Sequence, residues 1–92
     1  MQFEWDPTKD GRNQAKHGVS FMEATTVFDD PNQWTISDPD HSVYENRFLT
    51  TGYTHQGELI IVSHTEETED CIRIINARHA TAAERRTYEQ GF

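Results

Sequence analysis

The chain has 92 residues, of which 34% are hydrophobic, a length that holds one domain with a modest core and excludes a second domain. Its 16 acidic residues outnumber its 8 basic residues and give a net charge of −8, which argues against a broad basic surface for nucleic acid. A single cysteine, Cys71, excludes an internal disulfide, and the lack of an export signal or a membrane-length apolar run predicts a cytoplasmic protein that binds no membrane.

Two helices are predicted in the first third of the chain. Asp6-Pro7 is typical of an N-cap followed by proline in the first helical turn, which predicts a helix from about Pro7 to His17. Gly18 is suited to close that helix in a left-handed conformation. Ser20-Phe21-Met22-Glu23 is a capping box, and apolar residues recur after it at helical spacing, so a second helix is predicted to end before Asp29.

The middle of the chain predicts four strands, because four short segments are enriched in Thr, Ile, Val and aromatic residues. These segments are Trp34–Ser37, Arg47–Tyr53, Glu58–Thr65 and Cys71–Ala77, and the short alternating segment Phe3–Trp5 is not counted among them. The connections between the last three are too short for a crossover helix, so an antiparallel meander is expected.

Another capping box, Thr81 to Glu84, opens a final helix that is predicted to end near Gln90. Residues 1–92 are therefore expected to form one α+β domain. It would consist of two N-terminal helices, a four-stranded mainly antiparallel sheet and a C-terminal helix.

Charge is distributed unevenly along the chain. Residues 1–70 carry 4 basic and 14 acidic residues, a balance of −10, whereas residues 71–92 carry 4 basic and 2 acidic residues, a balance of +2. A surface that binds anions is therefore expected to draw heavily on the C-terminal quarter.

An ordered succession of short motifs spans nearly the whole chain: Phe3-Glu4-Trp5-Asp6-Pro7 with Lys9 and Asn13, Lys16-His17-Gly18-Val19-Ser20-Phe21 with Glu23-Ala24, Val27-Phe28, Glu45 with Arg47, His64-Thr65, Ile72-Arg73-Ile74-Ile75 with Ala77-Arg78, Ala80-Thr81, Glu84-Arg85 and Tyr88. This succession resembles the BrnT family, the ribonuclease toxins of type II toxin–antitoxin systems. The resemblance implies a RelE-like fold, cleavage of RNA without metal or cofactor, inhibition of translation, and neutralisation by a BrnA-like antitoxin. It also implies that operator DNA is contacted only through the antitoxin, in a complex that can hold a toxin dimer. The chain departs from the family pattern at Glu67, Asn76 and His79, where arginine, serine and a basic residue are common.

Metal-free RNA cleavage, in which the 2′-hydroxyl attacks the adjacent phosphorus, needs a proton acceptor, a proton donor and cations beside the phosphorane. The candidate catalytic residues are His64, Arg73 and Arg78, because histidine transfers protons near neutral pH and arginine matches phosphate oxygens. Strict alternation puts the two arginines on opposite faces, so both line one site only if the strand bulges or ends near Asn76. A structural ion pair for Arg73 and a turn-capping or solvated role for His64 remain alternatives.

The candidate RNA-binding residues are Lys16, His17, Arg47, Arg85, Arg86 and Tyr88. The first two also fit a role in which they only complement the dipole at the end of a helix. Arg47, two positions after Glu45, fits a salt bridge as well as a phosphate contact. For Arg85 and Arg86 a solvated charged face is the commoner explanation, and for Tyr88 an aromatic that docks a short helix is the commoner one.

The sequence bears on three other functions: a metal site, a non-catalytic binding module and direct DNA binding. The segment Asp38-Pro39-Asp40-His41 joins two carboxylates and an imidazole, but its spacing matches no metal site, and a solvated acidic turn explains it. The net charge of −8 favours a non-catalytic, partner-binding module of a toxin–antitoxin-like complex. DNA binding by the chain alone would need a basic recognition helix, which the sequence does not predict.

Overall fold

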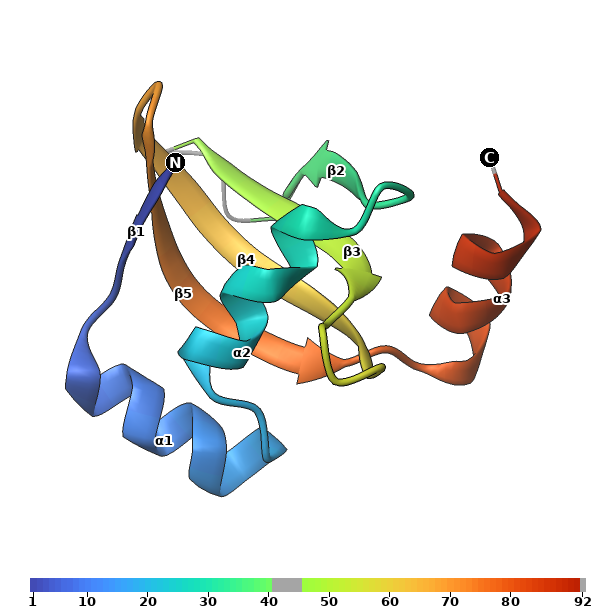
Figure 1. Ribbon diagram of the computed structural model, residues 1–92, viewed down its shortest axis with the longest axis horizontal. Coiled ribbons are helices and arrows are strands. Elements are labelled where there is room, and N and C mark those ends of the chain that lie inside the picture. The colour runs from blue at the N-terminus through green and yellow to red at the C-terminus, as the bar shows by residue number, and fades with distance from the viewer. Residues whose placement is uncertain (41–45, 92) are drawn as a thin grey trace.

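A computed structural model describes residues 1–40 and 46–91, and shows a sheet with two helices on one face and a third helix to one side (Figure 1). The elements in chain order are β1 (Gln2–Glu4), α1 (Pro7–His17), α2 (Phe21–Thr25), the 3-10 helix η1 (Thr26–Asp29), β2 (Trp34–Ser37), β3 (Arg47–Tyr53), β4 (Leu59–Thr68), β5 (Cys71–His79) and α3 (Ala82–Gln90). The strands lie in the order β1-β5-β4-β3-β2. Within the described part of the chain, no helix is long and apolar enough to span a membrane.

Local caps define the first and last helices, and both predictions are confirmed. A carboxylate oxygen of Asp6 accepts a hydrogen bond from the amide of Thr8 at 2.8 Å, and Gly18 closes α1 with a φ of 71°. At α3, the Thr81 hydroxyl accepts from the Glu84 amide at 3.2 Å, and the Glu84 carboxylate accepts from the Thr81 amide at 2.8 Å. Each cap involves residues two or three positions apart, which is why the sequence locates these helices.

The second predicted helix is shorter than expected. Ser20 caps it by accepting a hydrogen bond from the Glu23 amide at 3.0 Å, but α2 ends at Thr25 and the chain continues as η1. The hydroxyls of Thr25 and Thr26 donate to the carbonyls of Met22 and Glu23, each at 2.7 Å. Such hydroxyl bonds compete with regular helical hydrogen bonding, so the expected long helix is one short α-helix followed by a 3-10 helix.

The prediction of a four-stranded sheet is wrong by one strand. The expected antiparallel meander of β3, β4 and β5 is confirmed, and β2 also pairs antiparallel with β3. β1 adds a fifth strand that runs parallel to β5, with Phe3 opposite Ile72. Three residues are too few for a clear alternation signal, and their partner strand lies near the other end of the sequence. The sheet is therefore mixed, with β1 parallel to β5 and the other pairs antiparallel as the prediction of a mainly antiparallel sheet requires.

A β-bulge interrupts the pairing of β5 with β4. Ser63 lies opposite Asn76, whereas its neighbour His64 lies opposite Ile74. The extra residue, Ile75, has no partner of its own on β4, and it shifts the alternation of side chains along β5. The bulge therefore decides which side chains of β5 share a face.

The two faces of the sheet are covered differently. The face that packs against α1, α2 and η1, the core face, carries the buried apolar cluster Val19, Phe21, Ala24, Val27, Ile60, Val62, Ile72, Ile74 and Ala77. The opposite face, the outer face, carries the residues that alternate with these, including the cross-strand row Arg47–Thr65–Arg73 and the row Thr51–Ile61–Arg78. α3 lies against part of the outer face and contributes no buried residue.

Candidate functional site

A hollow of about 390 Å³ lies on the outer face, beside the bulge of β5. It is lined by Lys9, Asp38, Arg47, Ser63, Ile75 and Asn76, and is called the central hollow below. Its residues come from α1, from the position that follows β2, and from the strands β3, β4 and β5. Two cations, one carboxylate and two uncharged polar groups thus converge on one concave surface.

A second, smaller hollow of about 180 Å³ adjoins it along α1. Its lining consists of Lys9, Arg12, Asn13, Lys16, His17, Ile75 and Asn76, and it is called the α1 hollow below. Lys9, Ile75 and Asn76 line both hollows, so the two form one continuous surface, the cationic groove. The bulge places two successive residues of β5 in this groove, which strict alternation would not allow.

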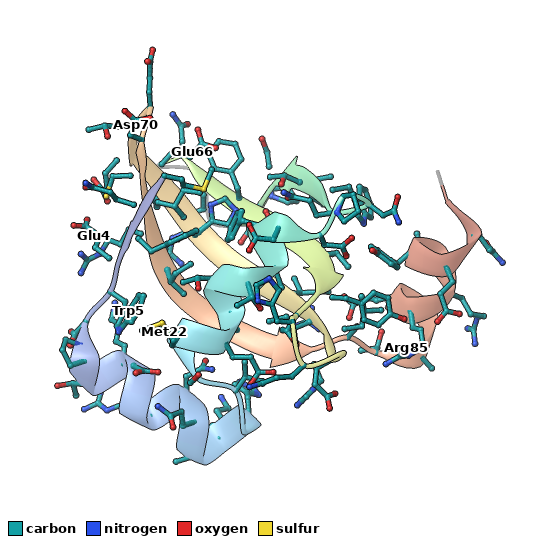
Figure 2. All side chains as sticks on the ribbon, in the orientation of Figure 1. Glu4, Trp5, Met22, Glu66, Asp70 and Arg85 are labelled. Carbon is teal, nitrogen blue, oxygen red and sulfur yellow. The ribbon has the colours of Figure 1, made fainter. Side chains whose placement is uncertain are left out.

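The basic residues of the groove come from the acidic part of the chain. All four Lys and Arg residues of the first 70, which are Lys9, Arg12, Lys16 and Arg47, line it. The expectation that an anion-binding surface draws on the C-terminal quarter is therefore wrong for this groove. Other acidic residues lie elsewhere: Glu66 and Asp70 lie at the end of the sheet where the β4–β5 hairpin turns, and Glu4 lies at the far end of β1 (Figure 2).

Asp38 is the carboxylate of the central hollow. It follows β2, its amide donates to the carbonyl of Arg47 at 2.9 Å, and its side chain accepts from the Asp40 amide at 3.1 Å. Only 7% of Asp38 is exposed, so the solvated turn expected here is wrong for this residue. His41 and Glu45 lie outside the described residues.

His64 lies on the core face rather than in the groove. Its ring stacks on Phe48 with a centroid distance of 5.8 Å and meets the edge of Phe28 at 5.1 Å, and 1% of the residue is exposed. Nε2 is 2.7 Å from the Thr50 hydroxyl, which is 2.7 Å from that of Thr35. Nδ1 has no hydrogen-bond partner among the described residues, and burial lowers the pKa of His64 to about 4. His64 is thus a neutral core histidine, and its predicted place beside the two arginines is wrong.

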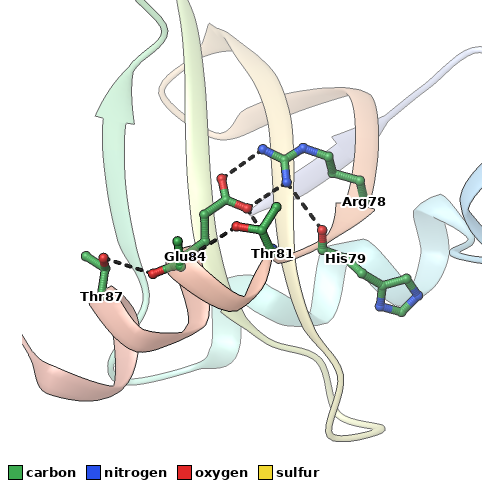
Figure 3. Close-up of polar contacts among 6 residues, drawn as sticks. Arg78, His79, Thr81, Glu84 and Thr87 are labelled. Atoms are coloured by element: carbon green, nitrogen blue, oxygen red, sulfur yellow. Dashed lines mark hydrogen bonds and ion pairs between the residues drawn. The ribbon is translucent and has the colours of Figure 1, made fainter.

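The bulge puts Arg73 and Arg78 on the same face, but the two side chains do not meet. They are five positions apart, roughly 15 Å along a strand. Arg73 pairs with Glu4 of β1 at 3.5 Å, with about half of each side chain exposed. Arg78 forms a two-point ion pair with Glu84 of α3, with N–O distances of 2.8 and 2.9 Å (Figure 3). This contact raises the pKa of Arg78, and it lowers the pKa of Glu84 to about 2.

The three candidate residues on α3 lie away from the groove. The Tyr88 hydroxyl donates to Asp30, and its ring meets that of Tyr53 edge-on at 5.4 Å. Burial and the neighbouring Asp30 raise the pKa of Tyr88, so it remains a neutral donor. Arg85 contacts the Tyr53 hydroxyl at 3.3 Å, while Arg86 is exposed. These contacts attach α3 to the sheet, as a docking aromatic would.

Seven residues that line the groove were not among the candidate catalytic or RNA-binding residues from the sequence: Lys9, Arg12, Asn13, Asp38, Ser63, Ile75 and Asn76. A signal for two of them was present, because Lys9, Arg12 and Lys16 recur at the three- and four-residue spacing of one helix face. Across residues 1–40 and 46–91, no group of three or more His, Cys, Asp or Glu side chains is arranged to hold a metal ion.

Comparison with known proteins identifies the family. Residues 5–84 match the family model of the ribonuclease toxin BrnT of type II toxin–antitoxin systems. A search of curated protein sequences finds no match. Among solved structures, the chain is similar to the Brucella abortus ribonuclease toxin BrnT, with a TM-score of 0.67. The two sequences are 21% identical, and the match covers 88% of this chain and 97% of that chain, so this comparison shows a similar fold. The resemblance drawn from the motifs is thereby confirmed, and the chain belongs to the BrnT family of type II toxin–antitoxin ribonuclease toxins.

Proposed function

We propose that this protein is the toxin of a toxin–antitoxin pair and cleaves RNA in the cationic groove, without a metal ion, so that translation is inhibited. The observation that carries the proposal is the gathering of Lys9, Arg12, Lys16 and Arg47 around one concave surface in a chain whose net charge is −8. Affinity for nucleic acid depends on cations that contact successive phosphates, rather than on net charge alone. Membership of a ribonuclease toxin family supports the same activity.

The central hollow has the groups that metal-free cleavage requires. In the proposed reaction Asp38 accepts the proton of the 2′-hydroxyl, whose oxygen then bonds to the adjacent phosphorus. The bond to the 5′-oxygen breaks, this oxygen takes a proton from water, and a 2′,3′-cyclic phosphate remains. Lys9 and Arg47 offset the charge that develops on the phosphorane oxygens, and preorganised charges of this kind contribute several kcal/mol, on the order of 2.7–4 for a single donor. His64 has no part in the proposal, because it is buried on the core face.

The test compares two variants that remove the same charge from different places. Arg47→Gln changes the central hollow, and Arg86→Gln changes an exposed position on α3. Each purified protein is assayed for cleavage of RNA with EDTA present, and each is expressed in cells to measure growth arrest. We expect the wild type and Arg86→Gln to cleave RNA and arrest growth, and Arg47→Gln to do neither while it stays folded. Cleavage that stops on addition of EDTA would contradict metal independence.

The partner is proposed on the same basis. Membership of a type II system implies an antitoxin, and we propose a BrnA-like antitoxin that neutralises the toxin in the cytoplasm and provides the contacts to operator DNA. A toxin dimer within that complex is part of the proposal. If a folded wild-type protein neither cleaves RNA nor arrests growth, but still binds its antitoxin, the chain is a non-catalytic partner-binding module instead.

A further inference from the structure

Asn13 is a buried polar residue in the middle of α1, and its side chain makes three hydrogen bonds. Its Nδ2 group donates to the carbonyls of Val19 and Ala77, each at 2.8 Å, and its Oδ1 accepts from the amide of Ala77 at 3.1 Å. Only 5% of Asn13 is exposed. All the hydrogen-bonding atoms of this amide are therefore committed to backbone groups of two other segments.

These bonds complete the edge of the sheet. β1 pairs with β5 only from Cys71 to Arg73, and α1 rather than a strand lies beside the rest of β5. A helix backbone cannot pair with a strand, because its own hydrogen bonds are made internally. The side-chain amide of Asn13 bonds both the N–H and the C=O of Ala77, as a neighbouring strand would. It thereby attaches α1 to β5 at one defined position.

That position is two residues beyond the bulge that forms the floor of the groove. Lys9, Arg12 and Lys16 lie four positions before, one before and three after Asn13, within about one turn of the helix on either side. All three line the α1 hollow, where Ile75 and Asn76 of β5 face them. A shift or rotation of α1 relative to β5 would therefore move all three cations together.

We infer that Asn13 is a positioning residue for RNA: its amide holds α1 at the depth and rotation that align these three cations with successive phosphates of a single strand. The inference rests on the proposed function, because it assigns Asn13 to the same groove. Asn13 lines the α1 hollow, but its amide is bonded to backbone groups, so it acts on RNA through α1. Its replacement is expected to weaken RNA binding by more than a general reduction in stability would.

The experiment measures binding of a single-stranded oligonucleotide with a 2′-deoxy linkage at the cleavage position, so that no cutting occurs. We expect Asn13→Ala to weaken binding by about tenfold, and to reduce the slope of log affinity against log salt concentration by about 0.7 for each phosphate that the cations no longer reach. In a background of Arg12→Ala and Lys16→Ala, the same Asn13 substitution should change affinity by less than about threefold, because two of the cations that it positions are gone.

Val27→Ala is the matched control for stability, because Val27 is fully buried in the core but does not line the groove. It should lower the thermal midpoint and leave RNA affinity unchanged at a temperature where it is folded. The inference is overturned if Asn13→Ala binds RNA like the wild type, or if its reduction in affinity is the same in the Arg12 and Lys16 background. Asn13→Ser, a milder change, serves the same comparison if Asn13→Ala does not fold.

A second experiment distinguishes failure of this inference from failure of the proposed function. If the wild type binds no RNA, inorganic phosphate is titrated instead, and the backbone amide signals of α1 are followed by nuclear magnetic resonance. Phosphate-dependent shifts in the wild type that disappear in Asn13→Ala, but persist in Val27→Ala, would support positioning for a phosphate ligand other than RNA. Equal shifts in all three proteins would overturn it.

Discussion

Arg78 and Glu84 join the end of β5 to the first turn of α3 through two parallel contacts, with N–O distances of 2.8 and 2.9 Å (Figure 3). The same carboxylate closes the capping box by accepting from the amide of Thr81. One ion pair therefore both starts α3 and holds it against the sheet. This matters because α3 has no buried residue of its own.

Removing this pair is expected to loosen α3 rather than to stop catalysis. Arg78→Gln and Glu84→Gln should each lower the free energy of unfolding by about 1 kcal/mol, with a coupling of about 0.5–1 kcal/mol because both side chains are partly exposed. Urea unfolding of the two single variants and the double variant measures the coupling, and amide exchange reports the opening of α3. If Arg78→Gln abolished RNA cleavage while Glu84→Gln left it intact, Arg78 would instead act directly on RNA.

His64 makes stability depend on pH in a predictable direction. Burial lowers its pKa from 6.5 to about 4, so the folded protein resists its protonation. Its contribution is fully present above the unfolded pKa of 6.5 and is lost as pH falls toward about 4. Between about pH 7.5 and about pH 5, this residue alone should reduce the free energy of unfolding by about 2 kcal/mol.

Urea unfolding at the two pH values checks this expectation. His64→Phe keeps an aromatic ring between Phe28 and Phe48 and should show a pH dependence about 2 kcal/mol smaller than that of the wild type. Val27→Ala alters the core without removing a titratable group and is the control, which should retain the wild-type dependence. An unchanged pH dependence in His64→Phe would show that His64 is already protonated or exposed in solution.

Asp38→Asn should affect catalysis and binding in opposite directions. Loss of the proposed proton acceptor should lower the rate of cleavage by about 10² to 10⁴, while removal of a negative charge from the central hollow should tighten RNA binding. Single-turnover cleavage and oligonucleotide binding separate the two effects. Asp40→Asn removes the same charge from an exposed neighbour and should leave cleavage unchanged. Faster cleavage by Asp38→Asn would indicate that Asp38 only repels the substrate.

Two glycines should respond differently to alanine. A Cβ at Gly52 would lie 3.0 Å from a methyl carbon of Val27 and 3.1 Å from a carboxylate oxygen of Asp30, so Gly52→Ala should destabilise the fold by about 1–3 kcal/mol. A Cβ at Gly11 would meet nothing within 4 Å, so Gly11→Ala should stabilise α1 by about 0.5–1 kcal/mol. Thermal unfolding of the two variants gives the comparison, and destabilisation by Gly11→Ala would contradict the open surroundings of that position.

Local patterns in the sequence determined much of the fold. The caps at Asp6 and Thr81 locate α1 and α3 because a cap satisfies backbone groups within three residues of itself. Composition locates β2 to β5, and the short connections between β3, β4 and β5 require these three strands to be antiparallel. The ordered motifs were sufficient to indicate the family.

Only the tertiary structure decided how the site is built. The pairing of β1 with β5, the bulge at Ile75 and the attachment of Asn13 to Ala77 join segments that are far apart in sequence or shift the register by one residue. A shift of one residue moves a side chain to the other face of a sheet, which is why the bulge at Ile75 puts Arg73 and Arg78 on one face. His64 lies in the core because it alternates with Ser63 and Thr65 along β4 and so shares the face of Ile60 and Val62. The four basic residues of an acidic region meet in one groove because the fold brings α1 and β3 to the same surface. Charge counted along a chain therefore does not predict charge on a folded surface.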